Sequence, residues 1–191
     1  MQRAPLLAIT SAYRMASTNC LSAVAGVLPL DLEVRRLVMN RKLRKGEVTS
    51  QEYENAIARL IEEWQDRYDA MDKGEWTKFM IPDLARRVEI PLKLDHYTTQ
   101  FLTGHGDFNS KLYSFKLQQS PNCSCGNGAE TVRHVLLACT RTRDFREKLK
   151  TVMTEEGAAW PPDSGAFLRT RRTYETLRKF SKDSLQNRTD R

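Results

Sequence analysis

The sequence lacks several features that would assign it to a broad class at once. Its 191 residues contain no apolar run near the 18 residues that a membrane span needs. The short apolar patch from Pro5 to Ile9, soon followed by Arg14, is not typical of a secretory signal. The sequence also has no Gly-Lys-Ser/Thr phosphate loop, no His-Glu-x-x-His helix and no pair of adjacent aspartates for a two-metal polymerase site. We therefore expect a binding module with no catalytic residues and no membrane partner, inside the cell and both nuclear and cytoplasmic.

Cysteine and histidine are scarce, but their spacing is informative. In a chain that is not secreted, cysteines act first as thiols or metal ligands rather than in disulfides. Three of the four cysteines and one of the three histidines fall within seventeen residues, with the spacing C-x-C-x8-H-x4-C: Cys123, Cys125, His134 and Cys139. Four such donors can surround zinc tetrahedrally and leave no open position for water. We predict a structural zinc site; the alternative is three incidental cysteines near a surface histidine.

The chain as a whole has no excess of acidic residues, but one segment of it does. The formal net charge is +7, which divides into +5 over residues 1–48, −5 over 49–72, +2 over 73–163 and +5 over 164–191. Two basic ends around an acidic strip predict separate surfaces with separate partners. The alternative is that these charges simply belong to solvated helix faces.

A basic helix is predicted between Asp31, as its cap, and Gly46. Its apolar residues Leu32, Val34, Leu37 and Val38 would anchor it, and a helix of this charge density could lie along nucleic-acid phosphates. A second group of cations surrounds or follows the predicted zinc ligands. The predicted nucleic-acid contacts in the two groups are Arg35, Arg36, Arg41, Lys42, Arg44, Lys45, Arg133, Arg141, Arg143 and Arg146. An exposed helix face without a partner explains the first group equally well.

The strongest helix signal starts at Thr49, where Thr49-x-x-Glu52 is a capping box. Apolar residues then recur at helical spacing until Gly74. One face is apolar and the rest is acidic, so this helix should pack on its neighbours and repel nucleic acid. Further along, His105 lies between two glycines without a nucleophile or carboxylate at a suggestive spacing, and we expect it to have a structural role in a turn.

Several segments resemble one family. AYRMAST (12–18) and AGVLPLDL (25–32) are similar to the segment that follows the polymerase palm in non-LTR (LINE-type) retrotransposon reverse transcriptases. GEWTKFMIPDL (74–84), TQFLTGHGDF (99–108) and the Cys-Cys-His-Cys knuckle resemble the C-terminal domain of the same polyproteins. The sequence departs from the family pattern at some positions. Thr99 and Lys111 stand in place of a usual leucine and tyrosine, and Arg86 or Arg87 stands where a tryptophan often follows the IPDL segment (81–84).

The resemblance implies a parent polyprotein that nicks target DNA and primes reverse transcription from it. Its thumb would hold template and product, and its knuckle would bind RNA or target DNA. Cys123, Cys125, His134 and Cys139 match the family's zinc ligands, and residues 104–106 match its GHG segment. The palm, with its aspartates, and the endonuclease are not represented, so the resemblance predicts no polymerase or nuclease activity for this chain alone. Its partners would be RNA or DNA and the palm of a related element.

These observations together predict a mainly α fold with four segments. Residues 1–48 form a small thumb-like helical bundle, and 49–75 a long acidic amphipathic linker helix. Residues 76–157 form a C-terminal domain with a zinc knuckle and irregular loops, and 158–191 a basic helical tail, whose docking the sequence does not decide. The alternative function is a fragmentary or host-adopted protein-interaction module with a purely structural knuckle.

Overall fold

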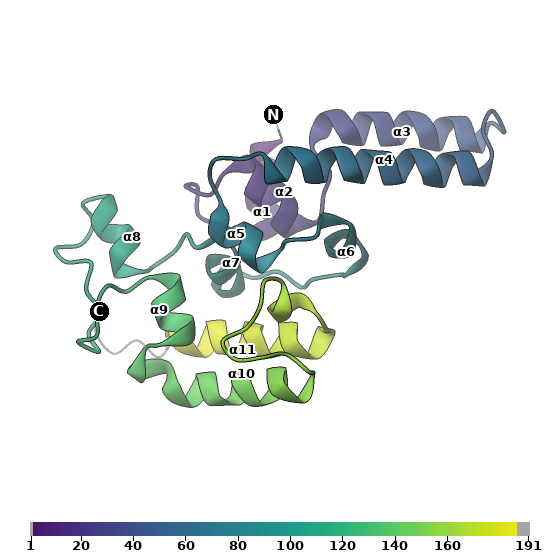
Figure 1. Ribbon diagram of the computed structural model, residues 1–191. Coiled ribbons are helices and arrows are strands. Elements are labelled where there is room, and N and C mark those ends of the chain that lie inside the picture. The colour runs from purple at the N-terminus through teal and green to yellow at the C-terminus, as the bar shows by residue number, and fades with distance from the viewer. Residues whose placement is uncertain (1, 187–191) are drawn as a thin grey trace.

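The computed structural model describes residues 2–186, and in this range the chain is helical, with no β-strand beyond an isolated bridge between Asn122 and Ala129 (Figure 1). The predicted mainly α fold class is confirmed. The helices are α1 (Arg3–Thr10), α2 (Thr18–Ala25), α3 (Leu30–Arg44), α4 (Ser50–Asp69), α5 (Glu75–Met80), α6 (Leu84–Glu89), α7 (His96–Thr103), α8 (Asn109–Ser114), α9 (Val132–Leu137), η1 (Thr140–Thr142), α10 (Arg143–Glu155), η2 (Ala166–Leu168) and α11 (Arg171–Gln186). None of the helices within the described range is long and apolar enough to cross a membrane.

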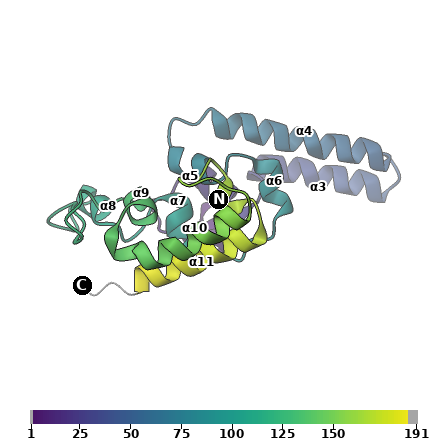
Figure 2. The same cartoon turned by 60° about the horizontal axis from the view of Figure 1, so that its bottom comes forward.

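Helices α3 and α4 form a hairpin that extends away from the rest of the molecule in both views (Figures 1 and 2). The predicted capping box starts α4: Thr49 Oγ1 accepts the Glu52 N–H at 3.2 Å, and the Glu52 carboxylate accepts the Thr49 N–H at 2.8 Å. Between the helices, Arg35 pairs with Glu63 and Arg67 pairs with Asp31, each at 2.6 Å, and within α4 Arg67 also pairs with Glu63. These exposed pairs are screened by solvent, so they align the two helices more than they stabilise them.

The hairpin corrects two details of the predicted basic helix. Pro29 occupies the N-cap position of α3, so Asp31 lies in the first turn, where its carboxylate pairs with Arg67 instead of capping. Among the four apolar residues expected to anchor the helix, only Leu32 is buried; the other three, Val34, Leu37 and Val38, are about half exposed. Helix α4 packs beside α3 but leaves about half of each of these three side chains open to solvent.

Helix α7 lies at the centre of the body, with six of its eight residues buried. The Phe101 ring makes edge contacts with Phe108 and Phe180, each at a centroid distance of 5.5 Å. Thr99, where the resemblance implies a leucine, is fully buried, and its hydroxyl donates to the Thr10 carbonyl at 2.7 Å. The polar replacement is therefore satisfied inside the core.

The predicted tail packs back on the body. Helix α11 runs beside α10 in both views and also contacts α7 (Figures 1 and 2). The Tyr174 hydroxyl donates to the Lys93 carbonyl at 2.9 Å, and Arg178 pairs with Asp95 at 3.0 Å. Residues 187–191 of the predicted tail lie outside the described residues.

One large core joins residues from all four predicted segments: Leu28, Trp64, Phe101 and Leu177 belong to the same buried cluster. A smaller cluster of Leu6, Ala16 and Leu21 holds α1 against α2. The boundaries between the segments stay predictions, but all four segments contribute residues to the same buried core.

Candidate metal centre

A tight loop positions the first two candidate ligands. The Asn122–Ala129 bridge closes it, and within it the Cys123 N–H donates to the Gly128 carbonyl at 2.8 Å. Gly126 (φ 79°) and Gly128 (φ 94°) adopt left-handed backbone conformations that residues with a Cβ rarely take. These glycines allow the chain to turn sharply enough for both thiols to face one point.

Helix α9 and the two residues after it position the other two ligands. Thr131 caps the helix by accepting the His134 N–H at 3.0 Å, and Val135 and Leu136 are buried in the core. The Cys139 N–H donates to the His134 carbonyl at 2.8 Å, which returns the chain toward the loop. Packing of a short helix therefore fixes the direction of the imidazole.

The four side chains predicted from spacing come together. Their ligand atoms all lie within 4.8 Å of one another. Cys123 Sγ lies 3.6 Å from Cys139 Sγ, and Cys125 Sγ lies 3.2 Å from His134 Nε2. Tetrahedral zinc, with bonds of about 2.0 to 2.3 Å, places its ligand atoms roughly 3.3 to 3.8 Å apart. The cluster of three thiols and one imidazole can hold a metal ion, and its donor set and spacing fit zinc.

The two thiols of the loop differ in acidity. Burial raises the pKa of Cys123 to about 12. Burial also opposes ionisation of Cys125, but hydrogen bonds from the Asn127 N–H and from the neighbouring ligand side chains lower the pKa of this thiol to about 6. A bound cation deprotonates coordinating thiols outright, so it would overcome the difference.

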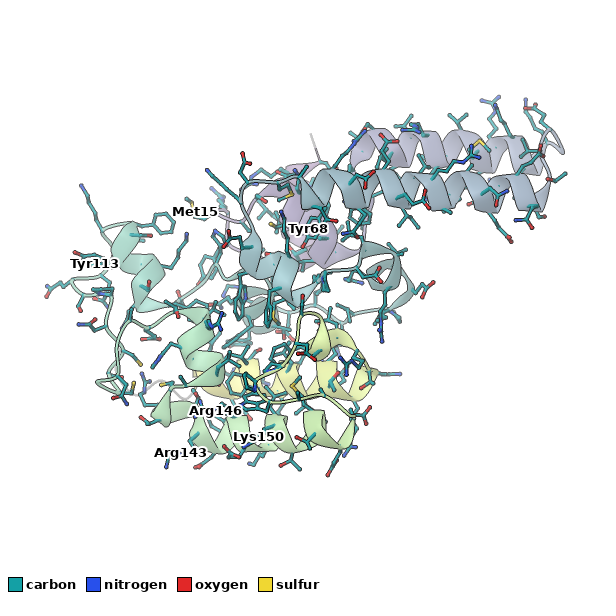
Figure 3. All side chains as sticks on the ribbon, viewed as in Figure 1. Met15, Tyr68, Tyr113, Arg143, Arg146 and Lys150 are labelled. Carbon is teal, nitrogen blue, oxygen red and sulfur yellow. The ribbon has the colours of Figure 1, made fainter. Side chains whose placement is uncertain are left out.

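Arg146, one of the predicted nucleic-acid contacts, lies behind the cluster and supports it. This residue is only 7% exposed, and its guanidinium donates to the Cys139 carbonyl at 2.7 Å and to Thr142 Oγ1 at 3.2 Å. Figure 3 shows Arg146 on α10 between Arg143 and Lys150. The α10 periodicity turns Arg146 toward the core, so it is not available as a surface contact for nucleic acid.

The remaining predicted cations near the cluster lie at the surface. Arg133 and Arg143 are exposed. Arg141 is exposed as well, and its guanidinium donates to Ser124 Oγ at 2.5 Å, which links η1 to the thiol loop.

The other predicted cations lie on the hairpin, at the opposite end of the molecule from α8 (Figure 1). Arg35 and Arg36 are held by Glu63 and Glu33, and Lys45 lies 3.4 Å from Glu47. The remaining three are exposed at the hairpin tip without a carboxylate partner among residues 2–186: Arg41, Lys42 and Arg44. The structure thus separates the predicted contacts into two distant sets.

The GHG segment ends α7 and packs closely against that helix. Gly104 (φ 68°) is the C-cap, and a Cβ added at Gly106 would lie 2.2 Å from Gln100 Oε1. His105 Nδ1 lies 2.8 Å from the Thr103 carbonyl, and burial lowers the pKa of the imidazole. The expected structural role of His105 fits these contacts.

Sequence reasoning missed Tyr113, which is half exposed on α8 beside the cysteine loop (Figure 3). A signal was present: residues 108–142, which we call the knuckle lobe, contain Lys111, Lys116, Arg133 and Arg141 but a single acidic residue. A lone tyrosine in such a stretch was a candidate contact.

Comparison with known proteins finds relatives in one group. The Retrovirus-related Pol polyprotein from type-1 retrotransposable element R1 4 of Nasonia vitripennis is 29% identical over 202 residues, covering 97% of this chain and 51% of the relative. The 115 kDa protein in element R1DM of Drosophila melanogaster and the Pol polyprotein from element R1 of Bradysia coprophila are each 31% identical, covering 76% of this chain and 16% of the relative. The chain thus spans about half or less of these relatives. No family model matches the chain, and no solved structure matches it.

Proposed function

Because the chain is homologous to the Pol polyproteins of R1 non-LTR retrotransposable elements over most of its length, we propose that it is a nucleic-acid-binding part of such a polyprotein. Its partial coverage of the relatives is consistent with the C-terminal position that the motifs suggest. The ligands would be RNA and target DNA, and the chain would act in the nucleus and the cytoplasm.

The observation that carries this proposal is the distribution of exposed cations. Arg41, Lys42 and Arg44 gather at the hairpin tip, where no carboxylate among the described residues pairs with them, and Arg133 and Arg143 lie on the surface near the metal cluster. The acidic side chains of α4 are partly occupied by the cations nearer the hairpin base, such as Arg35 and Arg67. Cations that the fold leaves unneutralised at two distant places suit a long polyanion.

In this proposal the metal is zinc, and its role is structural. Cys123, Cys125, His134 and Cys139 would hold it, and four protein ligands leave no position for an activated water. When bound, the ion would cross-link the thiol loop to α9. We assign no polymerase or nuclease step to this chain alone, since those activities would belong to other segments of such polyproteins.

The salt dependence of binding tests the proposal. The zinc-loaded chain should bind labelled RNA or DNA with an affinity that falls steeply between about 50 and 200 mM salt. Replacing Arg41, Lys42 and Arg44 together by glutamine should reduce the slope of log affinity against log salt by about 2 to 3. Arg35→Gln is the matched control, because Glu63 already neutralises Arg35. A flat slope for the unaltered chain would contradict the proposal.

A second candidate function is protein interaction, and one observation favours it. Leu30, Val34, Leu37 and Val38 recur at helical spacing along α3, and each is about half exposed. An apolar stripe of this kind is typical of a protein contact, such as one with the polymerase palm of a related element. In that case, replacing Val34 and Leu37 by serine would abolish partner binding while the salt slope for nucleic acid would stay unchanged.

A further inference from the structure

Tyr113 is unusual among the aromatic residues of this protein. It is 49% exposed, and no other phenylalanine, tyrosine or tryptophan side chain among residues 2–186 is exposed to this extent. The other large exposed apolar side chains are aliphatic or methionine. A large aromatic ring that the fold leaves half exposed is available for a ligand.

The position of Tyr113 is tied to the metal cluster. The Ser110 N–H donates to the Glu130 carbonyl at 3.2 Å, and the Asn109 side-chain amide donates to the Asn122 carbonyl at 2.9 Å. Both acceptors flank the bridge that closes the thiol loop. Helix α8 is therefore attached to the knuckle, and Tyr113 stands on a supported element rather than on a free loop.

The knuckle lobe that carries Tyr113 exposes charge of one sign. Its cations are Lys111, Lys116, Arg133 and Arg141, and its single acidic residue, Glu130, is 3% exposed. Within this lobe the exposed charges are all positive. Phosphates are therefore attracted to the lobe that presents the ring.

The surface is also rich in side chains that form neutral hydrogen bonds. Gln118, Gln119, Ser120 and Asn127 are exposed in the two loops of the lobe. Amides and hydroxyls of this kind can donate to or accept from base edges and sugars. Leu117 beside them is 72% exposed and has no ring.

We propose that the knuckle lobe binds single-stranded nucleic acid and that Tyr113 stacks on an unpaired base. An aromatic ring can stack only on a base whose face is free, which duplexes offer at their ends alone, whereas unpaired strands offer one at every nucleotide. The lobe combines positive charge with an aromatic ring on a helix that is hydrogen-bonded to the knuckle, a combination that suits single-strand binding. This inference rests on the proposed nucleic-acid function and narrows it to a strand type and a contact residue.

The test measures binding of the zinc-loaded full chain to a labelled oligouridylate and to a blunt duplex of equal length. Tyr113→Ala should weaken binding of the single strand by about 5- to 150-fold, the range found for base–aromatic stacking, and leave duplex binding nearly unchanged. Tyr113→Phe should bind as the unaltered chain does. The salt slope should be the same for all three, because stacking neutralises no phosphate.

Leu117→Ala is the matched control, since it removes exposed apolar surface from the same lobe without removing a ring. An equal loss in Leu117→Ala would indicate a generic apolar contact and overturn the proposal. The proposal also fails if Tyr113→Ala binds the single strand normally, or if Tyr113→Phe loses as much as Tyr113→Ala. If binding depends steeply on salt but Tyr113→Ala leaves the single-strand affinity unchanged, this inference alone is refuted. If the unaltered chain binds neither probe, the proposed function is refuted as well.

Discussion

The hairpin and the knuckle lobe achieve order by opposite means. The hairpin consists of helices of 15 and 20 residues with a capping box, first-turn acids and last-turn cations on α3, and ion pairs between the helices. The lobe has two helices of six residues, and both cysteines of its loop are tied to α9 only through the cluster and a few hydrogen bonds. Local interactions are sufficient for long helices with well-capped ends, but a helix of six residues is too short to be stable by itself. Zinc should therefore matter greatly to one region and little to the other.

Removal of the metal should have the largest effect. A structural zinc contributes on the order of 10 kcal/mol in small zinc domains, so Cys139→Ser or chelation should abolish hydrogen-exchange protection over residues 120–140. The hairpin should keep its protection, because its contacts do not involve the cluster. The control is Cys20→Ala, which alters the one cysteine outside the cluster and should retain one zinc per chain. Retention of zinc by Cys139→Ser would refute the ligand assignment.

Trp64→Ala alters the hairpin and should lower the free energy of unfolding by about 3 to 5 kcal/mol. Trp64 is 2% exposed where α4 enters the main core, and truncation leaves a cavity there. Chemical denaturation measures the loss, and metal analysis should still find one zinc per chain. Glu54→Ala, at an exposed position of the same helix, should change little. Loss of zinc in Trp64→Ala would show that the regions are more strongly coupled than their construction suggests.

Arg146→Met should lower zinc affinity by about 10- to 100-fold, the effect usual for groups that orient metal ligands. The guanidinium holds the carbonyl of Cys139, and methionine keeps the apolar stem without the donors. Competition with a chromophoric chelator measures the affinity. Arg143→Met, in the preceding turn of α10 and exposed, should not change it. Equal effects of the two substitutions would rule out a positioning role for Arg146.

Thr49→Ala should have the smallest effect, about 1 kcal/mol, because it removes the hydroxyl half of the capping box. The loss should appear as faster hydrogen exchange in the first turn of α4 and leave zinc affinity unchanged. Thr49→Ser should retain the cap. A loss in zinc affinity here would contradict the separation of the two regions.

The sequence predicts best what local chemistry decides. The start of α4 follows from Thr49 and Glu52, and the ligands follow from cysteine and histidine spacing. It could not predict which side of α3 is covered, since Val34 and Leu37 look like core residues until the position of α4 is known. Burial of cations was equally inaccessible: Arg146 braces Cys139, and Arg87, near a usual tryptophan position, is 5% exposed with its guanidinium bonded to the Val24 carbonyl. These outcomes depend on contacts between segments far apart in the chain.

The contact of Phe180 with Phe101 has a consequence for the order in which the protein forms. Helix α7 is made early, but the ring that completes its environment belongs to the last described helix. During synthesis on the ribosome, the hairpin can form as soon as it emerges, because its contacts are local, while the body must wait for α11. A chain that ends prematurely near residue 157 would leave Phe101 uncovered and prone to aggregate. Closure of the core around Phe101 therefore requires α11 to have been synthesised.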